Sequence, residues 1–261
     1  MEKKVYKKSI LDPNKFVAII GYLVITFLLS SLVIIFLGFI IAKANNLSNS
    51  ILNETLTATD LSKYPLEYIK ANSLAQGYGN LIGYMLATIF VSFYMRDDLI
   101  TDFRDLMNRK KYHSLYIPFS AISFCLLVLA VDFLVAKFVP VSDNQSTIES
   151  IINYGGAFPM VIATVIFAPV VEELIYRKAI FYYGKRYGTA ACYIFSIIFF
   201  TLPHMLSSDV SNIGVWLLQC VPYASSAAML CFIYHKSNYN IYTAIAAHML
   251  NNTIAVLFTL L

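Results

Sequence analysis

The chain has 261 residues, of which 59% are hydrophobic and only 13% are charged, and its mean hydropathy is +0.67. These values exclude an ordinary soluble globular domain and indicate an integral membrane protein. The net charge of +4 is less informative than the placement of the cations, and we expect the lipid bilayer rather than a nucleic acid as partner. The four cysteines show no CxxC or CxxH spacing, which argues against a disulfide framework or a thiolate metal site.

Seven apolar runs are long enough to cross a hydrocarbon core of about 30 Å as helices. They cover residues 16–42, 74–95, 116–139, 158–178, 187–204, 215–234 and 241–261. The first run is too long for a signal-peptide core and is expected to stay as a span. We therefore predict an all-α, polytopic transmembrane bundle of about seven spans. Its expected parts are three N-terminal spans with their loops (1–157) and a four-span core (158–261) within one membrane domain.

The basic residues predict the orientation. With the N-terminus inside, the outer segments carry only Lys43, Lys63, Lys70 and Lys137, so 15 of the 19 basic residues lie inside. An odd number of spans then places the C-terminus outside. The segment 96–113 mixes acidic and basic residues and is expected to form a short amphipathic helix at the inner surface.

The first three spans show no charge that we expect to be buried, so function is expected in the last four. There, Glu172 and Glu173 interrupt the apolar run before Arg177. Glu173 and Arg177 are four residues apart and share a helix face, which predicts an ion pair. Glu172 points about 100° away and lacks that cation, so it is the better candidate for chemistry. A structural pair of glutamates near the membrane interface is the alternative interpretation.

Two further spans carry polar side chains. His204 follows Pro203 at the end of its span, where a lone histidine is usually a satisfied interfacial residue. His248 and Asn252 lie four residues apart within the last span and share one face. Two polar groups on one face of a membrane helix need buried partners or water, which makes them candidates for a functional site.

A carboxylate, two imidazoles and an amide on three spans can perform water-dependent acyl hydrolysis. Glu172 with a nearby histidine can deprotonate water, and His248 with Asn252 can donate to the developing oxyanion. No Gly-x-Ser-x-Gly motif indicates a nucleophilic serine. Two versions stay open: one that requires no cofactor, which we favour slightly, and one with zinc held by Glu172, His204 and His248, although His-Glu-x-x-His is absent.

The three motifs in series resemble those of the CAAX protease and bacteriocin-processing (CPBP or Abi) family of intramembrane peptidases, which includes the type II CAAX prenyl endopeptidases. The family pattern is Glu-Glu-x-x-x-Arg, Phe-x-x-x-His and His-x-x-x-Asn on successive helices. This chain carries it as Glu172, Glu173 and Arg177, then Phe200 and His204, then His248 and Asn252. The likeness covers about residues 158–261.

The resemblance implies roles for these residues. Glu172 and His204 would activate water, and His248 and Asn252 would bind the oxyanion. Glu173, Arg177 and Phe200 would give the site structural support.

The resemblance also implies an intramembrane endopeptidase, of the glutamate type or a metallopeptidase, that cuts a peptide or membrane-protein substrate. The Lys-, Asn- and Ile-rich composition looks like a bacterial member in the cytoplasmic membrane. Peptide maturation, bacteriocin processing or immunity, and signalling are then the expected roles, with a bacteriocin or pheromone precursor as substrate or a sensor kinase as partner. The alternative is a non-catalytic membrane protein that gives bacteriocin immunity or modulates a sensor kinase.

The spacing of the motifs disagrees with straight spans. Glu172 and His248 would lie about 10 Å from the inner surface, whereas His204, about 16 residues into its span, would lie about 24 Å from it. We therefore expect the span 187–204 to start later, tilt or break, with Pro203 as the candidate break. We also expect the four candidate residues to line one polar cavity that is reached from the cytoplasmic side, since polar groups facing lipid cost free energy.

Overall fold

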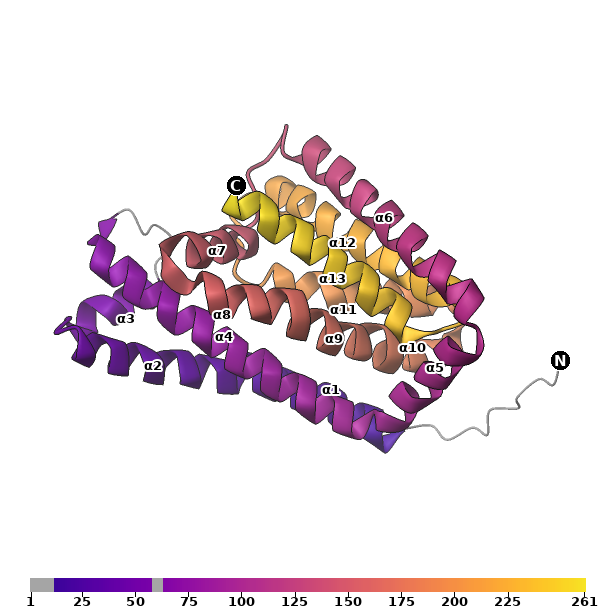
Figure 1. Cartoon of the computed structure of the whole chain (residues 1–261). Helices are drawn as coiled ribbons and strands as arrows, with labels where there is room; N and C mark the ends of the chain where they lie inside the picture. The colour runs from indigo at the N-terminus through magenta and orange to yellow at the C-terminus, as the bar shows by residue number, and fades with distance from the viewer. Residues whose placement is uncertain (1–11, 58–62) are drawn as a thin grey trace.

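The computed structural model describes residues 12–57 and 63–261, and every regular element in these ranges is a helix (Figure 1). The N-terminal part contains α1 (Pro13–Leu23), η1 (Val24–Leu29), α2 (Ser30–Ala44), α3 (Asn49–Thr57), α4 (Leu66–Tyr94), α5 (Arg96–Asn108) and α6 (Lys110–Val135). The C-terminal part contains α7 (Asp143–Ile151), η3 (Ile152–Gly156), α8 (Ala157–Ile162), η4 (Ala163–Phe167), α9 (Ala168–Glu173), η5 (Leu174–Ile180), α10 (Phe181–Gly184), η6 (Lys185–Tyr187), α11 (Thr189–His204), α12 (Ile213–Lys236) and α13 (Ile241–Leu260). The predicted all-α class is confirmed.

Helices occupy all seven predicted spans. In the described part of the chain, five helical segments are long and apolar enough to cross a membrane: Pro13–Ala44, Lys110–Val135, Asp143–Tyr187, Ile213–Lys236 and Ile241–Leu260. Helix α4 becomes a sixth when it is counted with α5, from which it is bent by 82°. Helix α11 is apolar but has only 16 residues. The chain is thus a multi-pass membrane protein, while the number of seven spans and the N-in, C-out orientation stay predictions.

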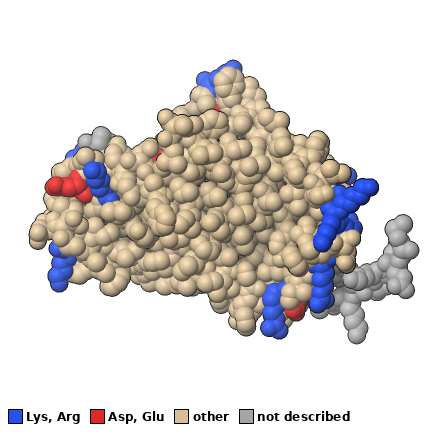
Figure 2. Space-filling model, in the orientation of Figure 1, with Lys and Arg blue, Asp and Glu red and all other residues tan. Residues whose placement is uncertain are grey.

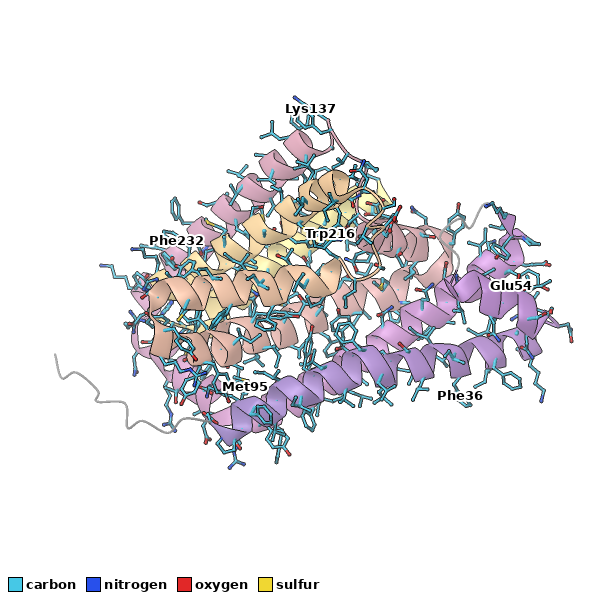
Figure 3. The ribbon with its side chains drawn as sticks, turned by 180° about the vertical axis from the view of Figure 1, so that it is seen from behind. Phe36, Glu54, Met95, Lys137, Trp216 and Phe232 are labelled. Atoms are coloured by element: carbon cyan, nitrogen blue, oxygen red, sulfur yellow. The ribbon has the colours of Figure 1, made fainter. Side chains whose placement is uncertain are left out.

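The outer surface of the bundle is apolar between its two ends. Phe36 and Phe119, for example, are 63% and 71% exposed, and Figure 3 shows Phe36 and Phe232 on the outside of the helices. Charged side chains gather at the ends of the molecule and at the tip of α6, and a broad band between them is nearly free of charge (Figure 2). A lipid bilayer is the solvent in which such a surface is stable.

Helix α5 crosses one end of the bundle (Figure 1). Its side chains bind both the segment that contains Lys178 and the start of α13. The Asp102 carboxylate pairs with Lys178 Nζ at 2.7 Å and accepts the backbone N–H of Ile241 at 2.8 Å. The Asn240 amide donates to the Asp105 carboxylate at 2.9 Å. The amphipathic helix predicted within residues 96–113 is therefore present, and it fixes the start of α13 level with Lys178.

The helix of the predicted fourth span does not end at residue 178, because the helical segment continues to Tyr187, while the end of the membrane span itself stays a prediction. Arg177 is fully buried, and Lys178 binds Asp102, so these two cations do not end the segment. The chain turns at Gly188, whose φ of 100° is a conformation that glycine adopts without strain. Glu172 lies sixteen residues before this glycine and His204 sixteen residues after it.

The new boundary places the candidate residues at one depth. Because the chain reverses at Gly188, equal spacing on both sides gives Glu172 and His204 similar heights along the bundle. His248 follows Ile241 by seven residues, and Glu172 precedes Lys178 by six, while Asp102 holds Ile241 and Lys178 together. The depth disagreement therefore disappears. The predicted break at Pro203 is wrong, since α11 continues to His204.

Candidate active site

Glu173 and Arg177 form the ion pair that their spacing predicts. Both side chains are fully buried, and Arg177 Nη1 lies 3.2 Å from Glu173 Oε1. The guanidinium group also lies 4.7 Å from the centre of the Phe200 ring and donates from Nη2 to the Ala227 carbonyl at 3.4 Å. Contacts from three helices thus surround one buried cation and offset part of the cost of removing it from water, while Arg177 Nε and Glu173 Oε2 have no hydrogen-bond partner among the described residues.

His248 lies between the two glutamates. Its Nδ1 is 2.9 Å from Glu173 Oε1, and its Nε2 is 4.0 Å from Glu172 Oε2. A carboxylate can only accept at Nδ1, so Glu173 holds the imidazole with a proton on that nitrogen. The Nε2 edge is thereby directed toward Glu172. Sequence reasoning paired Glu173 with Arg177 but did not foresee that Glu173 would also orient His248.

Glu172 is buried, with 4% of its surface exposed, and no Lys or Arg forms an ion pair with it in the described part of the chain. The Tyr84 hydroxyl on α4 donates to Glu172 Oε1 at 3.4 Å. Oε1 is therefore occupied by Tyr84, while Oε2 faces His248. Tyr84 is a residue that the sequence did not single out, because the chain contains 19 tyrosines and nothing local distinguishes this one.

No direct hydrogen bond or ion pair joins His204 to Glu172, so the shared role in water activation that the family resemblance implies stays a prediction. His204 Nδ1 donates to the Phe200 carbonyl at 2.7 Å, which leaves Nε2 as the free nitrogen. The ring stacks between Phe200 and Tyr223, with centroid distances of 4.7 and 4.8 Å. The Phe200 ring also lies 6.0 Å from His248. The imidazole nearest to Glu172 is thus that of His248.

Asn252 serves the backbone of a neighbouring helix. The Ala168 N–H donates to the Ala163 carbonyl, five residues earlier, which is the hydrogen-bond spacing of a π-helix. At the same spacing, the donor to the Thr164 carbonyl would be residue 169, but this is a proline and has no N–H. The Asn252 amide donates to this carbonyl at 2.8 Å. One amide hydrogen therefore has a structural role, and one stays available for other contacts.

Glu172, His204, His248 and Asn252 all line one cavity of about 1040 Å³, as predicted. The cavity extends away from Glu172 toward the loop that follows α6, α7 and the end of α13. On the other side of Glu172, toward α5, apolar side chains such as Leu174, Ile175 and Phe181 are packed without exposure. The α5 end is the one predicted to be cytoplasmic. The N-in orientation and access from the cytoplasmic side therefore do not agree with each other, and both stay predictions.

The cavity also receives a carboxylate from the third span. Asp132 on α6 lines it with an exposed side chain, so the prediction that the first three spans carry no buried charge is not contradicted. The described residues provide no ion pair or side-chain hydrogen bond to Asp132. An acidic residue within an otherwise apolar span is the signal that could have identified it.

The zinc alternative requires three ligand side chains around one point. In the part of the chain that the structure describes, no three His, Cys, Asp or Glu side chains are grouped in this way. Glu172 and His248 approach each other, but the stacked His204 ring does not join them. As arranged, these three residues do not fit a zinc site, and we derive no step through a metal.

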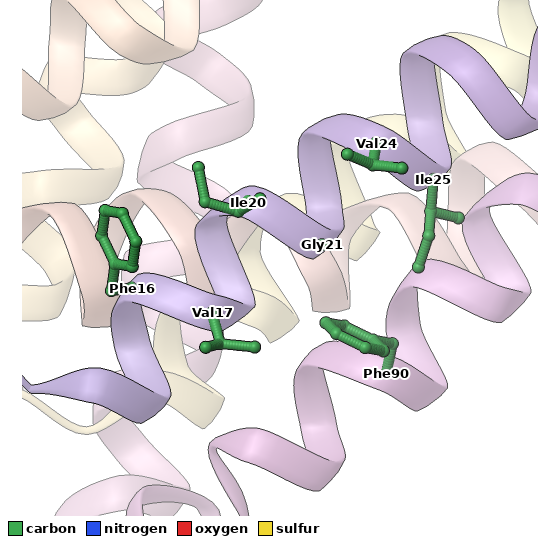
Figure 4. Close-up of a pocket in the computed structure, with 7 residues that line it drawn as sticks. All are labelled: Phe16, Val17, Ile20, Gly21, Val24, Ile25 and Phe90. Atoms are coloured by element: carbon green, nitrogen blue, oxygen red, sulfur yellow. The ribbon is translucent and has the colours of Figure 1, made fainter.

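A second, apolar hollow lies on the outside of the bundle between α1 and α4 (Figure 4). Its volume is about 350 Å³, and Phe16, Val17, Ile20, Gly21, Val24, Ile25 and Phe90 line it. No titratable or hydrogen-bonding side chain is present there. The candidate chemistry is confined to the polar cavity.

Residues 154–254 match a family model described as "Type II CAAX prenyl endopeptidase Rce1-like". This match confirms the family resemblance over the part of the chain that carries the three motifs. No curated protein and no solved structure matches the chain. Tyr84 and Asp132, which also line the cavity, lie outside the matched residues.

Proposed function

Because residues 154–254 match a family of proteases, we propose that the chain is an intramembrane endopeptidase in which Glu172 activates water. One observation carries this proposal: Glu172 and His248 face each other at 4.0 Å on the wall of a cavity large enough for a peptide segment. The distance is too long for a direct hydrogen bond but suits a water that bonds to both groups.

In the proposed reaction, Glu172 Oε2 takes a proton from this water while the water oxygen attacks the carbonyl carbon of the substrate. The C–O bond forms as the carbonyl π electrons move to oxygen and give a tetrahedral oxyanion. Collapse of the intermediate breaks the C–N bond, and Glu172 returns its proton to the leaving amine. Glu172 thus ends in its starting state, and no other reactant is needed.

Other side chains have positioning or electrostatic roles in this proposal. Glu173 keeps His248 oriented, and Tyr84 holds the second oxygen of Glu172. The free amide hydrogen of Asn252 can donate to the oxyanion, and His204 Nε2 is available to water or substrate. Without these contacts, the carboxylate and imidazole would sample several rotamers, and fewer molecules would hold the reactive geometry.

The proposed setting is the bacterial cytoplasmic membrane, and the proposed substrate is a peptide or membrane-protein segment. Maturation of a bacteriocin or pheromone precursor, bacteriocin immunity, and control of a sensor kinase are the roles that the resemblance to the CAAX protease and bacteriocin-processing family suggests. No cofactor is proposed. No Lys or Arg of the described residues pairs with Glu172, and this supports a chemical role over a purely structural one, since a structural carboxylate in a membrane is normally paired.

The test is hydrolysis of a mixed peptide library by the purified chain in detergent, with products identified by mass spectrometry. We expect specific cleavage products that persist in the presence of a metal chelator and are absent with Glu172→Gln. Loss of activity with the chelator, and its return with zinc, would contradict the metal-free mechanism. Products that persist with Glu172→Gln, or a biological effect of the chain that this variant retains in full, would favour the non-catalytic alternative.

A further inference from the structure

The described lining of the polar cavity contains acidic side chains but no Lys or Arg. Among the described residues that line it, Asp132, Glu149 and Glu172 are acidic, and none is Lys or Arg. Lys137 is the basic residue nearest to Asp132 in the sequence. Its Nζ lies 4.4 Å from the centre of the Phe133 ring, and Lys137 does not line the cavity. Figure 3 shows this lysine at the tip of α6. A charged substrate group that enters this space therefore meets carboxylates and two imidazoles, but no Lys or Arg of the described lining.

The three carboxylates differ in their surroundings. Glu172 is bound by Tyr84 deep in the cavity, and Glu149 accepts a hydrogen bond from Gln145 at 2.9 Å. Asp132 has no such partner in the described part of the chain. Asp132 lines the same cavity as Tyr223, the residue whose ring stacks on His204. Asp132 is thus a carboxylate that is free to bind an incoming group in the cavity that contains the candidate active site.

A cavity of one sign with apolar walls concentrates the electric field and discriminates between charged ligands. We propose that the cavity selects a substrate segment carrying a Lys or Arg side chain, with Asp132 as the specificity-determining residue. This inference rests on the proposed function, which it deepens by naming a class of substrate. It also predicts discrimination against a substrate that presents its C-terminal carboxylate here, because like charges in such a space repel each other.

The location of Asp132 supports this assignment. Its helix, α6, ends at Val135, on the side of the cavity that continues to the loop after α6 and to α7. A segment that enters from this end would pass Asp132 before it reaches Glu172. Asp132 at the entrance would then bind a cationic residue near one end of the substrate segment. The peptide bond to be cut would lie near the other end, beside Glu172.

The experiment measures binding rather than hydrolysis, so that its failure is distinguishable from failure of the proposed function. The probes are two labelled apolar peptides with blocked termini that differ only at one internal position, Lys or Glu. They are titrated against the full chain carrying Glu172→Gln in detergent. We expect the Lys peptide to bind about tenfold more tightly than the Glu peptide.

The carboxylate is then removed from the cavity. Adding Asp132→Asn is expected to bring the affinity ratio of the two peptides close to one, and Asp132→Glu is expected to retain most of it. Asp97→Asn is the matched control, because Asp97 lies on α5 at the opposite end with a side chain that is 86% exposed. Equal affinities of the two peptides would contradict the proposed selection for Lys or Arg. An affinity ratio that Asp132→Asn changes no more than Asp97→Asn does would contradict the assignment of Asp132 as the specificity-determining residue.

Discussion

The two ends of the bundle use charged side chains in different ways. At the α5 end, carboxylates bind cations: Asp102 pairs with Lys178 at 2.7 Å, and Asp105 pairs with Arg109 at 2.6 Å. In the cavity, Glu172 has no Lys or Arg within ion-pair distance among the described residues, and His248 is its nearest imidazole. The Asp102–Lys178 pair at the α5 end connects two helices, whereas the Glu172 carboxylate lines the cavity.

This difference shows how adjacent glutamates acquire separate tasks. Glu173 points toward Arg177 and is fully buried, while Glu172 points toward Tyr84, His248 and the cavity. A buried charge without a cation is costly in a membrane protein, and it is retained where function requires it. Substitutions that separate effects on activity from effects on stability therefore test the comparison directly.

The largest effect is expected for Glu172→Gln. It should lower peptidase activity by about 10²- to 10⁴-fold, because the amide cannot accept a proton from water. The amount of folded protein and its melting temperature should stay close to those of the wild type, since no ion pair is lost. Hydrolysis of the peptide library and thermal unfolding in detergent measure the two quantities. A large fall in melting temperature would show that Glu172, like Glu173, mainly stabilises the fold.

The complementary variant is Glu173→Gln, which leaves Arg177 buried without its carboxylate. Breaking a buried pair in this way costs about 3 to 5 kcal/mol, so we expect much less folded protein and a lower melting temperature. His248 also loses its acceptor, and activity per folded molecule should fall as well. Fluorescence-detected gel filtration gives the folded amount. Equal amounts of folded Glu173→Gln and Glu172→Gln protein would contradict the conclusion that Glu173 contributes more to stability than Glu172.

A smaller effect is expected for Tyr84→Phe, which removes the hydroxyl that binds Glu172 Oε1. A net hydrogen bond to a carboxylate is worth about 1.5 kcal/mol, so kcat should fall about tenfold with little change in KM. Tyr22→Phe is the matched control, because the Tyr22 hydroxyl is buried and bonds to Tyr176 at 3.2 Å instead. The same loss in kcat for both variants would show that Tyr84 acts only through general packing.

The smallest effect concerns the α5 end. A hydrogen bond from Arg109 lowers the pKa of Asp105 from 3.8 to about 2. Since the pKa is lower in the folded state, the ionised carboxylate stabilises the fold above pH 3.8, and this contribution is lost as the pH falls toward 2. Asp105→Asn should therefore lower the melting temperature slightly at neutral pH, and the difference should vanish near pH 2. A difference that does not depend on pH would contradict this.

Local sequence patterns determined much of this protein. Apolar runs predicted where helices form, because the length and hydropathy of a span are properties of one segment. The spacing of Glu173 and Arg177 predicted their ion pair, because residues four apart meet on one helix face. The separate motifs also predicted that Glu172, His204, His248 and Asn252 would line one cavity, since polar groups in apolar spans gain by sharing it.

Only the tertiary structure decided which of these side chains touch. The helical segment that carries Glu172 does not end at Arg177 and Lys178 but continues to Tyr187, because Glu173 on the same segment neutralises Arg177 and Asp102 on α5 neutralises Lys178. Hydropathy alone does not reveal such partners.

The contacts around Glu172 likewise depend on how far each helix is shifted along its neighbours. Asp102 on α5 sets that shift for α13, which places His248 between the glutamates. Tyr84 and Asp132 reach the cavity from helices outside the recognised motifs, because a membrane bundle assembles its interior from segments far apart in the sequence.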